Sequence, residues 1–228
     1  MKSFPVEKFE ERLSGELPQR VIEWAFDTFG DKMAVACSFG GASGAVLLDM
    51  AIGVSPSIPI YYLDTGLLFP ETYEQVRLVS AHYGFTPIAV HPELSLDKQA
   101  AELGENLWER EPNRCCDLRK VAPQRSFLRG FRAWLTGVRR DQSTTRAATP
   151  VISWDANFEL VKINPLAAWT ERDVWKYITD RGVPYNPLLD RGYPSIGCVP
   201  CTAAVRTGED PRSGRWSGHS KDECGLHA

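Results

Sequence analysis

Short apolar runs that alternate with helix-length segments are the feature that most constrains the fold of this 228-residue chain. Five such runs are typical of buried strands, and they cover residues 33–38, 58–63, 87–91, 131–137 and 160–163. Strands that alternate with helices favour right-handed βαβ units and a parallel sheet. We therefore predict a single α/β domain, in which helices flank a mainly parallel, twisted sheet of five or six strands.

The segments between these runs carry helix signals. Apolar residues recur at helical spacing over residues 6–29 and 45–52, and a helix over residues 70–84 begins at a proline and ends at a glycine. A further helix should carry Cys115 and Cys116 and continue to residue 128, and another, capped by Thr170, should end before Gly182. Periodicity is lost after residue 184, so we expect one domain over residues 1–205 and an irregular, mobile tail over residues 206–228.

Polar or glycine-rich turns follow several of the predicted strands. Carboxyl ends of parallel strands meet at one edge of the sheet, where ligands of such folds bind. A glycine-rich turn before a helix offers free backbone N–H groups to an anion, although the same turn is also compatible with tight packing alone. No Gly-Lys-Ser/Thr follows the first turn, so it is not a P-loop. The candidate ligands at the turns after the first and fourth strands are Ser38, Gly40, Gly41, Ser43, Arg139 and Arg140.

Charge is distributed unevenly along the chain. The formal net charge is -3, which argues against nonspecific nucleic-acid binding. Residues 110–146 nevertheless hold ten Lys/Arg against three Asp/Glu, a local charge of +7 that leaves -10 for the remainder. A basic segment inside an acidic protein favours a small anionic ligand, and the alternative is a solvated helix face.

The six cysteines form a further pattern. Cys115 and Cys116 are adjacent, a spacing that strains a disulfide, and Cys198 and Cys201 form a second pair. Four thiolates can hold zinc or an iron–sulfur cluster, and an adjacent pair suits a cluster better. The second pair alone could also be a redox-active dithiol, but no strand–helix context surrounds it.

No signal peptide or apolar run long enough for a membrane span is evident. We therefore expect a reducing, cytoplasmic setting for these thiols, with no membrane attachment.

Four motifs in one order resemble the sulfonucleotide reductases of sulfate assimilation, in the branch that carries a [4Fe-4S] cluster. The motifs are Cys115-Cys116-x-x-Arg119-Lys120-Val121, Thr136-Gly137-x-Arg139-Arg140-Asp141-Gln142-Ser143-x-Thr145-Arg146, Gly197-Cys198-x-Pro200-Cys201-Thr202 and Glu223-Cys224-Gly225-Leu226-His227. The resemblance covers nearly the whole chain and implies a fold like that of the adenine nucleotide α-hydrolases. It also implies that Cys115, Cys116, Cys198 and Cys201 bind the cluster.

The resemblance further implies the reaction. Cys224 would attack the sulfur of adenosine 5'-phosphosulfate, expel AMP and carry a cysteine S-sulfonate, from which thioredoxin or a glutaredoxin-like reductant would release sulfite. The tail over residues 206–228 would then open and close as a lid. Leu63, Asp64, Thr65 and Gly66 would hold the adenosine. The candidate ligands of the phosphosulfate end of the substrate are Lys120, Arg139, Arg140, Arg212 and Arg215, and His227 is a further candidate substrate ligand.

Alternatives remain open at this point. The loop at residues 38–44 lacks the second serine and the acidic residue that relatives often show, so its nucleotide contacts are the least secure. The substrate could carry a 3'-phosphate and follow the same mechanism. An ATP pyrophosphatase on a related scaffold and a non-catalytic zinc module are the competing classes. The amphipathic face of residues 6–29 could pack on the core or against a second copy in a homo-oligomer.

Overall fold

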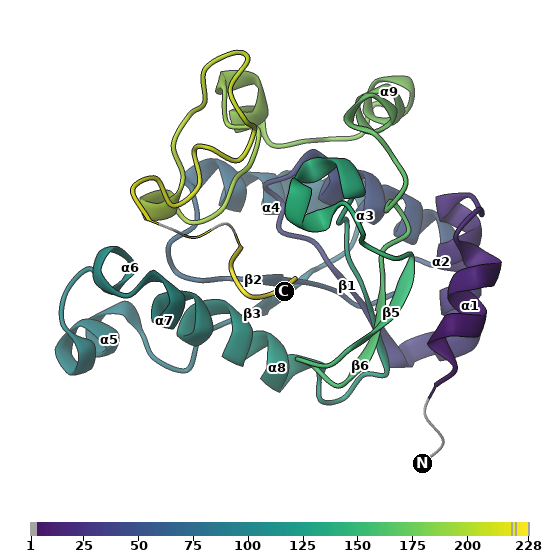
Figure 1. The fold of residues 1–228 in the computed structure, drawn as a ribbon, viewed down its shortest axis with the longest axis horizontal. Helices are drawn as coiled ribbons and strands as arrows, with labels where there is room; N and C mark the ends of the chain where they lie inside the picture. The colour runs from purple at the N-terminus through teal and green to yellow at the C-terminus, as the bar shows by residue number, and fades with distance from the viewer. Residues whose placement is uncertain (1–3, 220, 222, 228) are drawn as a thin grey trace.

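The sheet is the centre of the computed structural model, which describes residues 4–219, 221 and 223–227 (Figure 1). Six strands pair in the order β3-β2-β1-β4-β6-β5, and all pairings are parallel except that of β5 with β6. The strand bounds are β1 Met33–Ala36, β2 Ile60–Leu63, β3 Ile88–Val90, β4 Ala133–Leu135, β5 Ile152–Asp155 and β6 Leu160–Ile163. The predicted mainly parallel α/β sheet is confirmed.

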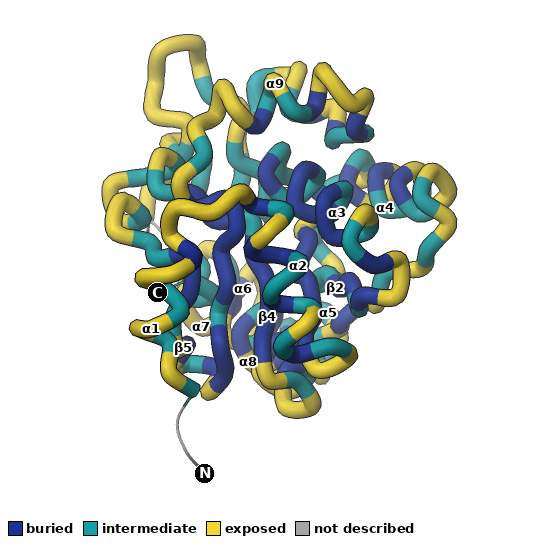
Figure 2. Tube along the Cα trace, turned by 90° about the vertical axis from the view of Figure 1, so that its right-hand side faces the viewer, coloured by how far each residue is buried: buried dark blue, intermediate teal, exposed yellow. Residues whose placement is uncertain are grey.

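Helices cover both faces of this sheet, as the two perpendicular views show (Figures 1 and 2). The helix bounds are α1 Val6–Leu13, α2 Pro18–Phe29, α3 Ala42–Val54, α4 Pro70–Tyr83, α5 Leu96–Leu103, α6 Leu107–Arg110, α7 Pro112–Cys116, α8 Ala122–Leu128 and α9 Glu171–Arg181. Helices α2, α3 and α9 pack together on one face, whereas α8 packs on the other. A single π turn, Asp117–Val121, joins α7 to α8.

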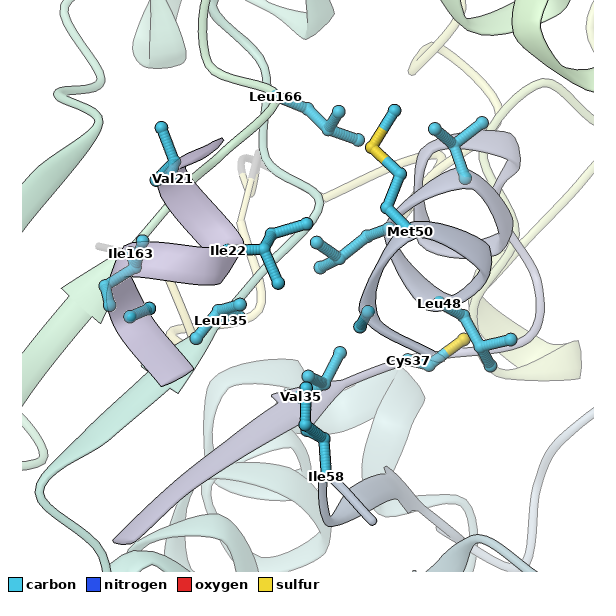
Figure 3. Close-up of a cluster of buried hydrophobic side chains, with 14 of the residues drawn as sticks. Val21, Ile22, Val35, Cys37, Leu48, Met50, Ile58, Leu135, Ile163 and Leu166 are labelled. Atoms are coloured by element: carbon cyan, nitrogen blue, oxygen red, sulfur yellow. The ribbon is translucent and has the colours of Figure 1, made fainter. Parts of the chain in front are cut away.

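Alternation along each strand divides the core between the two faces. In β1, Val35 faces the larger apolar cluster with α2 and α3, whereas Ala34 faces a smaller cluster beneath α8. In β4, Leu135 and Trp134 divide in the same way. Figure 3 shows side chains of α2, α3 and the strands converging in the larger cluster. This two-sided burial fixes the register of the strands and therefore the positions of the turns at their ends.

The structure also differs from the sequence-based prediction in places. The helical segment over residues 6–29 is two helices, separated by residues 14–17, because Pro18 begins a new helix. Strand β5 and helices α5 and α6 were not predicted. After α9 the described residues form short 3-10 turns and the isolated antiparallel bridges Leu68–Cys198 and Thr202–Arg215, in line with the loss of periodicity. Among the described residues, no helix is long and apolar enough to cross a membrane.

Candidate active site

A cavity of about 470 Å³ opens at the carboxyl ends of β1, β2 and β4. From β1 the chain adds β2 and then β3 on one side of the sheet, and it then returns to add β4 and the later strands on the other side of β1. The strand order therefore reverses between β1 and β4. A crevice at this reversal is where open α/β sheets bind ligands. Gly137, after β4, lets the turns after β1 and β4 lie close together, since a Cβ at this position would lie only 3.0 Å from the backbone of Ser43.

The turn after β1 is fixed by contacts from distant segments. Phe39 has a φ of 53°, and the amide of Asn186 donates a 3.1 Å hydrogen bond to its carbonyl oxygen. The hydroxyl of Ser43 accepts a 2.9 Å hydrogen bond from Nε of Arg139, whose Nη1 also pairs with Asp141 at 2.9 Å. Two residues predicted to bind substrate, Ser43 and Arg139, therefore contact each other and hold the turns after β1 and β4 together.

Most of the predicted substrate residues line this one cavity. They are Ser38, Gly40, Gly41, Ser43, Leu63, Thr65, Lys120, Arg139, Arg212, Arg215 and His227. Asp64, Gly66 and Arg140 do not appear among its lining residues. The carboxylate of Asp64 accepts hydrogen bonds from the N–H of Gly66 and the hydroxyl of Tyr73, which closes the turn on itself. Nε of Arg140 donates a 2.8 Å hydrogen bond to the carbonyl of Thr149.

The C-terminal tail enters the same cavity from the α8 face of the sheet. Cys224 is half-buried and lines the cavity together with Leu226 and His227. The side-chain amide of Asn157 donates a 3.2 Å hydrogen bond to the carbonyl of Gly225, and Leu226 packs against the smaller apolar cluster. Figure 1 shows this end of the chain, in yellow, finishing over the sheet. A cysteine close to the end of the sequence therefore reaches the carboxyl edge of the central strands.

His227 is placed between aromatic and cationic groups. Its ring stacks on Trp134 of β4, with the centroids 5.7 Å apart and the planes 6° apart. Burial lowers the pKa of His227 well below its ordinary value, and the nearby charges of Lys162, Arg146 and Arg212 lower it further. The imidazole is consequently neutral near pH 7, and its buried Nδ1 has no hydrogen-bond partner among the described residues.

Two cavity residues that the sequence analysis did not select, Arg146 and Glu223, form an ion pair next to Cys224. Nε and Nη2 of Arg146 each donate a 2.7 Å hydrogen bond to the carboxylate of Glu223, and Nη2 of Arg212 lies 3.3 Å from it. Both residues stand in motifs that mark the resemblance. Their pairing joins segments far apart in the chain, and no local pattern in the sequence indicates it.

Tyr61 and Gln124 are further cavity residues that the sequence did not reveal. Both side chains are buried, and within the part of the chain that the structure describes the hydroxyl of Tyr61 and Nε2 of Gln124 have no hydrogen-bond partner. Gln124 lies four residues after Lys120 on the same continuous helical segment, so the two side chains share a face. Buried polar groups that lack a protein partner are available to a ligand or to ordered water.

Lys120 connects the cavity to the cysteine pairs. Burial lowers its pKa, but the charges of Cys198 and Cys224 more than offset this and raise the pKa above its ordinary value. Lys120 is therefore a cation near pH 7. It lines both the large cavity and a smaller neighbouring cavity, so its charge acts on both.

The smaller cavity brings together the four cysteines of the 2 + 2 pattern, Cys115, Cys116, Cys198 and Cys201. Burial raises the pKa of Cys115 to about 12 and that of Cys201 to about 11, and neighbouring cysteines add to both shifts. Within the described residues, no three Cys, His, Asp or Glu side chains converge as the ligands of a single metal ion would. The cavity nevertheless supplies four thiols, which is the donor set that zinc sites and iron–sulfur clusters both use.

Polar groups surround these thiols. The hydroxyl of Thr65 lies 3.3 Å from Sγ of Cys198. Buried Arg119 donates a 2.6 Å hydrogen bond from Nε to the carbonyl of Thr65 and a 2.9 Å hydrogen bond to the side chain of Gln99. These contacts tie the cysteine helix to the turn after β2. A bound group in the smaller cavity would therefore be held against the floor of the larger one.

Comparison with known proteins agrees with this geometry. The family model of the phosphoadenosine phosphosulfate reductase domain matches residues 32–204. The chain is 51% identical over 211 residues to "Adenosine 5'-phosphosulfate reductase" of Salinibacter ruber, which covers 92% of this chain and 83% of that protein. It is also 51% identical over 208 residues to "Adenosine 5'-phosphosulfate reductase 1" of Bacillus subtilis, with 91% and 89% coverage.

Two solved structures extend the comparison. A phosphoadenylyl-sulfate reductase from Candida auris, crystallised with phosphate, superposes with a TM-score of 0.76 at 36% identity and covers 90% of this chain and 98% of that one. An FMN adenylyltransferase from Candida glabrata superposes with a TM-score of 0.61 at 16% identity, covering 87% of this chain and 65% of that one. The second likeness shows only a shared fold.

Proposed function

The chain belongs to the phosphoadenosine phosphosulfate reductase family, and from this premise we propose that it reduces adenosine 5'-phosphosulfate to sulfite and AMP in sulfate assimilation. Relatives named adenosine 5'-phosphosulfate reductase are identical to this chain at about half of the positions over most of its length. The enzyme is an oxidoreductase that acts on a sulfur group. We propose that it works in the cytoplasm, where thioredoxin keeps thiols reduced.

The observation that carries the proposal is the position of Cys224. Its side chain reaches a cavity that is lined on one side by backbone at the ends of β1, β2 and β4 and on the other by Lys120, Arg212 and Arg215. The backbone edge suits a nucleoside, and the cations suit the phosphate and sulfate of the substrate. A thiolate is the reactive form of cysteine, and nearby positive charge favours that form.

The first chemical step is nucleophilic displacement at sulfur. The Cys224 thiolate forms a bond to the sulfate sulfur, and the bond between that sulfur and the bridging oxygen breaks. The bonding electron pair passes to the phosphate of AMP, which leaves as an anion. Lys120 and Arg215 stabilise the charge that develops on this phosphate. The product on the enzyme is a cysteine S-sulfonate.

The second step uses the two electrons of a dithiol. A thioredoxin thiolate attacks Sγ of Cys224, the S–S bond to the sulfonate breaks, and sulfite leaves with its electron pair. The second thioredoxin thiol then resolves the mixed disulfide and regenerates the Cys224 thiol. Since Cys224 lies inside the cavity in the structure, the tail has to open before thioredoxin can reach it.

We propose that Cys115, Cys116, Cys198 and Cys201 hold a [4Fe-4S] cluster. The shared cavity of the four thiols and the adjacent spacing of Cys115 and Cys116 support this assignment. When bound, the cluster would join the α7 segment to the C-terminal loops and add a charged group beside Lys120. The electrons of the reaction come from thioredoxin, so the cluster donates none.

The test is sulfite release by protein purified without oxygen, with thioredoxin and either adenosine 5'-phosphosulfate or its 3'-phosphorylated form. We expect strong preference for the first substrate. Preference for the second would keep the mechanism and change the substrate, and silence with both would overturn the proposal. The variant Cys198→Ala should lose iron and the visible absorption of the cluster, whereas full iron content would remove Cys198 as a ligand.

A further inference from the structure

Glu223 directly precedes the nucleophile, and its carboxylate is held inside the cavity. Arg146 binds it through two parallel 2.7 Å hydrogen bonds, and Arg212 adds a contact of 3.3 Å. The side chains of Arg146 and Glu223 are only 11% and 16% exposed. A bidentate pair that is largely screened from water is stronger and more directional than an exposed one.

The arginine side of this pair is fixed independently of the tail. Nη1 of Arg146 donates a 2.6 Å hydrogen bond to Oε1 of Gln142, and the same oxygen accepts a hydrogen bond from the N–H of Arg139. Nε2 of Gln142 lies 3.4 Å from the hydroxyl of Ser43. Arg146 is thereby connected to the turns after β1 and β4, so the rigid edge of the sheet sets its orientation.

On the tail side, the described residues after Cys224 make contacts of their own. Gly225 accepts one hydrogen bond from Asn157, Leu226 packs on the smaller apolar cluster, and His227 stacks on Trp134. These contacts hold the tail after Cys224. The pair of Glu223 with Arg146 holds it immediately before Cys224, so the side chain of Cys224 is fixed between two anchored neighbours.

We infer that Glu223 is the positioning residue of Cys224, because its pair with Arg146 holds the tail in the closed state in which the thiolate faces the substrate. In this closed state Arg146 binds Glu223 and not the substrate. The negative charge of the substrate is then bound by Lys120 and the remaining arginines of the cavity. The pair breaks when the tail opens to the reductant. This inference rests on the proposed function.

The experiment compares wild type with Glu223→Gln, which keeps the shape of the side chain and removes its charge. The control is Glu74→Gln, which removes the carboxylate from an exposed Arg77–Glu74 pair in α4, away from the cavity. Three rates are measured. Mass spectrometry of the tail peptide gives the rate at which iodoacetamide alkylates Cys224 in substrate-free protein, and the rate at which adenosine 5'-phosphosulfate sulfonates Cys224 without thioredoxin. Sulfite detection gives the rate at which thioredoxin releases sulfite from protein that is already sulfonated.

We expect Glu223→Gln to be alkylated about tenfold faster and sulfonated about tenfold more slowly, with sulfite release not slowed and the control unchanged in all three rates. A defect in folding alone would slow both S-sulfonation and sulfite release, and not S-sulfonation only. Wild-type rates of alkylation and sulfonation in Glu223→Gln would overturn the inference.

A second comparison keeps the inference testable if that variant is unstable. Arg146→Lys retains a cation and loses the bidentate geometry, so it should show the same split of rates, and adding Glu223→Gln to it should change little further. Independent, additive effects of the two substitutions would contradict a pair that acts as a unit. If wild type gains no sulfonate at all, the proposed function fails, while the alkylation rates still decide whether Glu223 holds the tail.

Discussion

The sheet and the C-terminal segment after residue 192 hold their shape in different ways. Strands β1, β2, β4 and β6 bury apolar side chains on both faces, whereas beyond Leu188 the described residues with buried apolar side chains are Cys198 and Trp216. The C-terminal segment is held mainly by backbone hydrogen bonds such as that from Ala203 N–H to the carbonyl of Gly214, and by the ion pairs of Glu223. Its apolar contacts near the end are those of the partly buried Leu226 and of His227 on Trp134. Extensive apolar burial keeps the binding edge of the sheet folded, whereas a tail held mainly by polar contacts can open and close without unfolding the sheet.

The largest expected effect separates chemistry from folding. Cys224→Ser should lower sulfite release by more than about a thousandfold, because a hydroxyl near neutral pH is a far weaker nucleophile than a thiolate. The melting temperature should stay within about 2 °C of wild type, since Cys224 is not part of either apolar cluster. Retained sulfite release would remove Cys224 as the nucleophile.

The next largest effect tests the sheet. Leu135→Ala should lower the free energy of unfolding by about 2–5 kcal/mol, because Leu135 is fully buried between β4 and the helices α2 and α3. The same substitution at Leu17, which is 67% exposed, is the matched control and should cost less than about 0.5 kcal/mol. Denaturant unfolding measures both. Equal losses in the two variants would contradict the difference drawn between buried and exposed apolar side chains.

A smaller and local effect is expected in the C-terminal segment. A Cβ at Gly214 would lie 2.2 Å from the carbonyl oxygen of Ala203, so Gly214→Ala must push the two strands of this loop apart. We expect a loss of local protection from hydrogen exchange worth about 1–3 kcal/mol over residues 203–216, with the sheet unchanged. Gly15→Ala, where a Cβ meets nothing within 4 Å, is the control. Loss of protection throughout the sheet would mean that the two regions fold as one unit.

The smallest expected effect is a pH dependence of the closed tail. Burial lowers the pKa of His227 in the closed state, and an open tail would restore its ordinary value near 6.5. As the pH falls through 6.5, His227 takes up a proton in the open state but not in the closed state. The free energy that favours the closed state is therefore largest above pH 6.5 and decreases below it. Between pH 7.5 and 5.5 the protection of the tail should fall about tenfold.

His227→Phe keeps an aromatic ring against Trp134 and removes the titration, so its tail protection should not change over this range. Hydrogen-exchange protection factors of the tail peptide provide the measurement. An equal pH dependence in wild type and His227→Phe would exclude His227 as its source.

Much of the sheet could be predicted because its signals are local. Apolar runs marked β1 to β4 and β6, and Gly84 and Gly182 end their helices at a φ of 69° and 63°, which glycine adopts without strain. Thr170 forms the capping box that its spacing to Asp173 predicts. Strand β5 was missed because it is a short edge strand that alternates with polar residues and is paired antiparallel in a hairpin with β6.

The site was predictable where residue type alone limits the possibilities. Four cysteines in two pairs have few roles besides binding one group, and the structure brings them to one cavity. Residue type alone did not distinguish the two adjacent arginines. Arg139 lines the large cavity, whereas Arg140 does not line it and donates a hydrogen bond to the carbonyl of Thr149. The pairing of Arg146 with Glu223 depends on the closed tail, and such long-range contacts leave no pattern in the sequence.

The two cysteine pairs also fix the order of events during synthesis. A chain leaves the ribosome from its N-terminus, so Cys115 and Cys116 emerge while Cys198 and Cys201 are still inside it or not yet made. The cavity that the four thiols share cannot form until the chain has been made as far as Cys201. Any group that needs all four thiols is therefore loaded after that point, and not when the first pair emerges. Until then, the first pair depends on a reducing environment to stay usable.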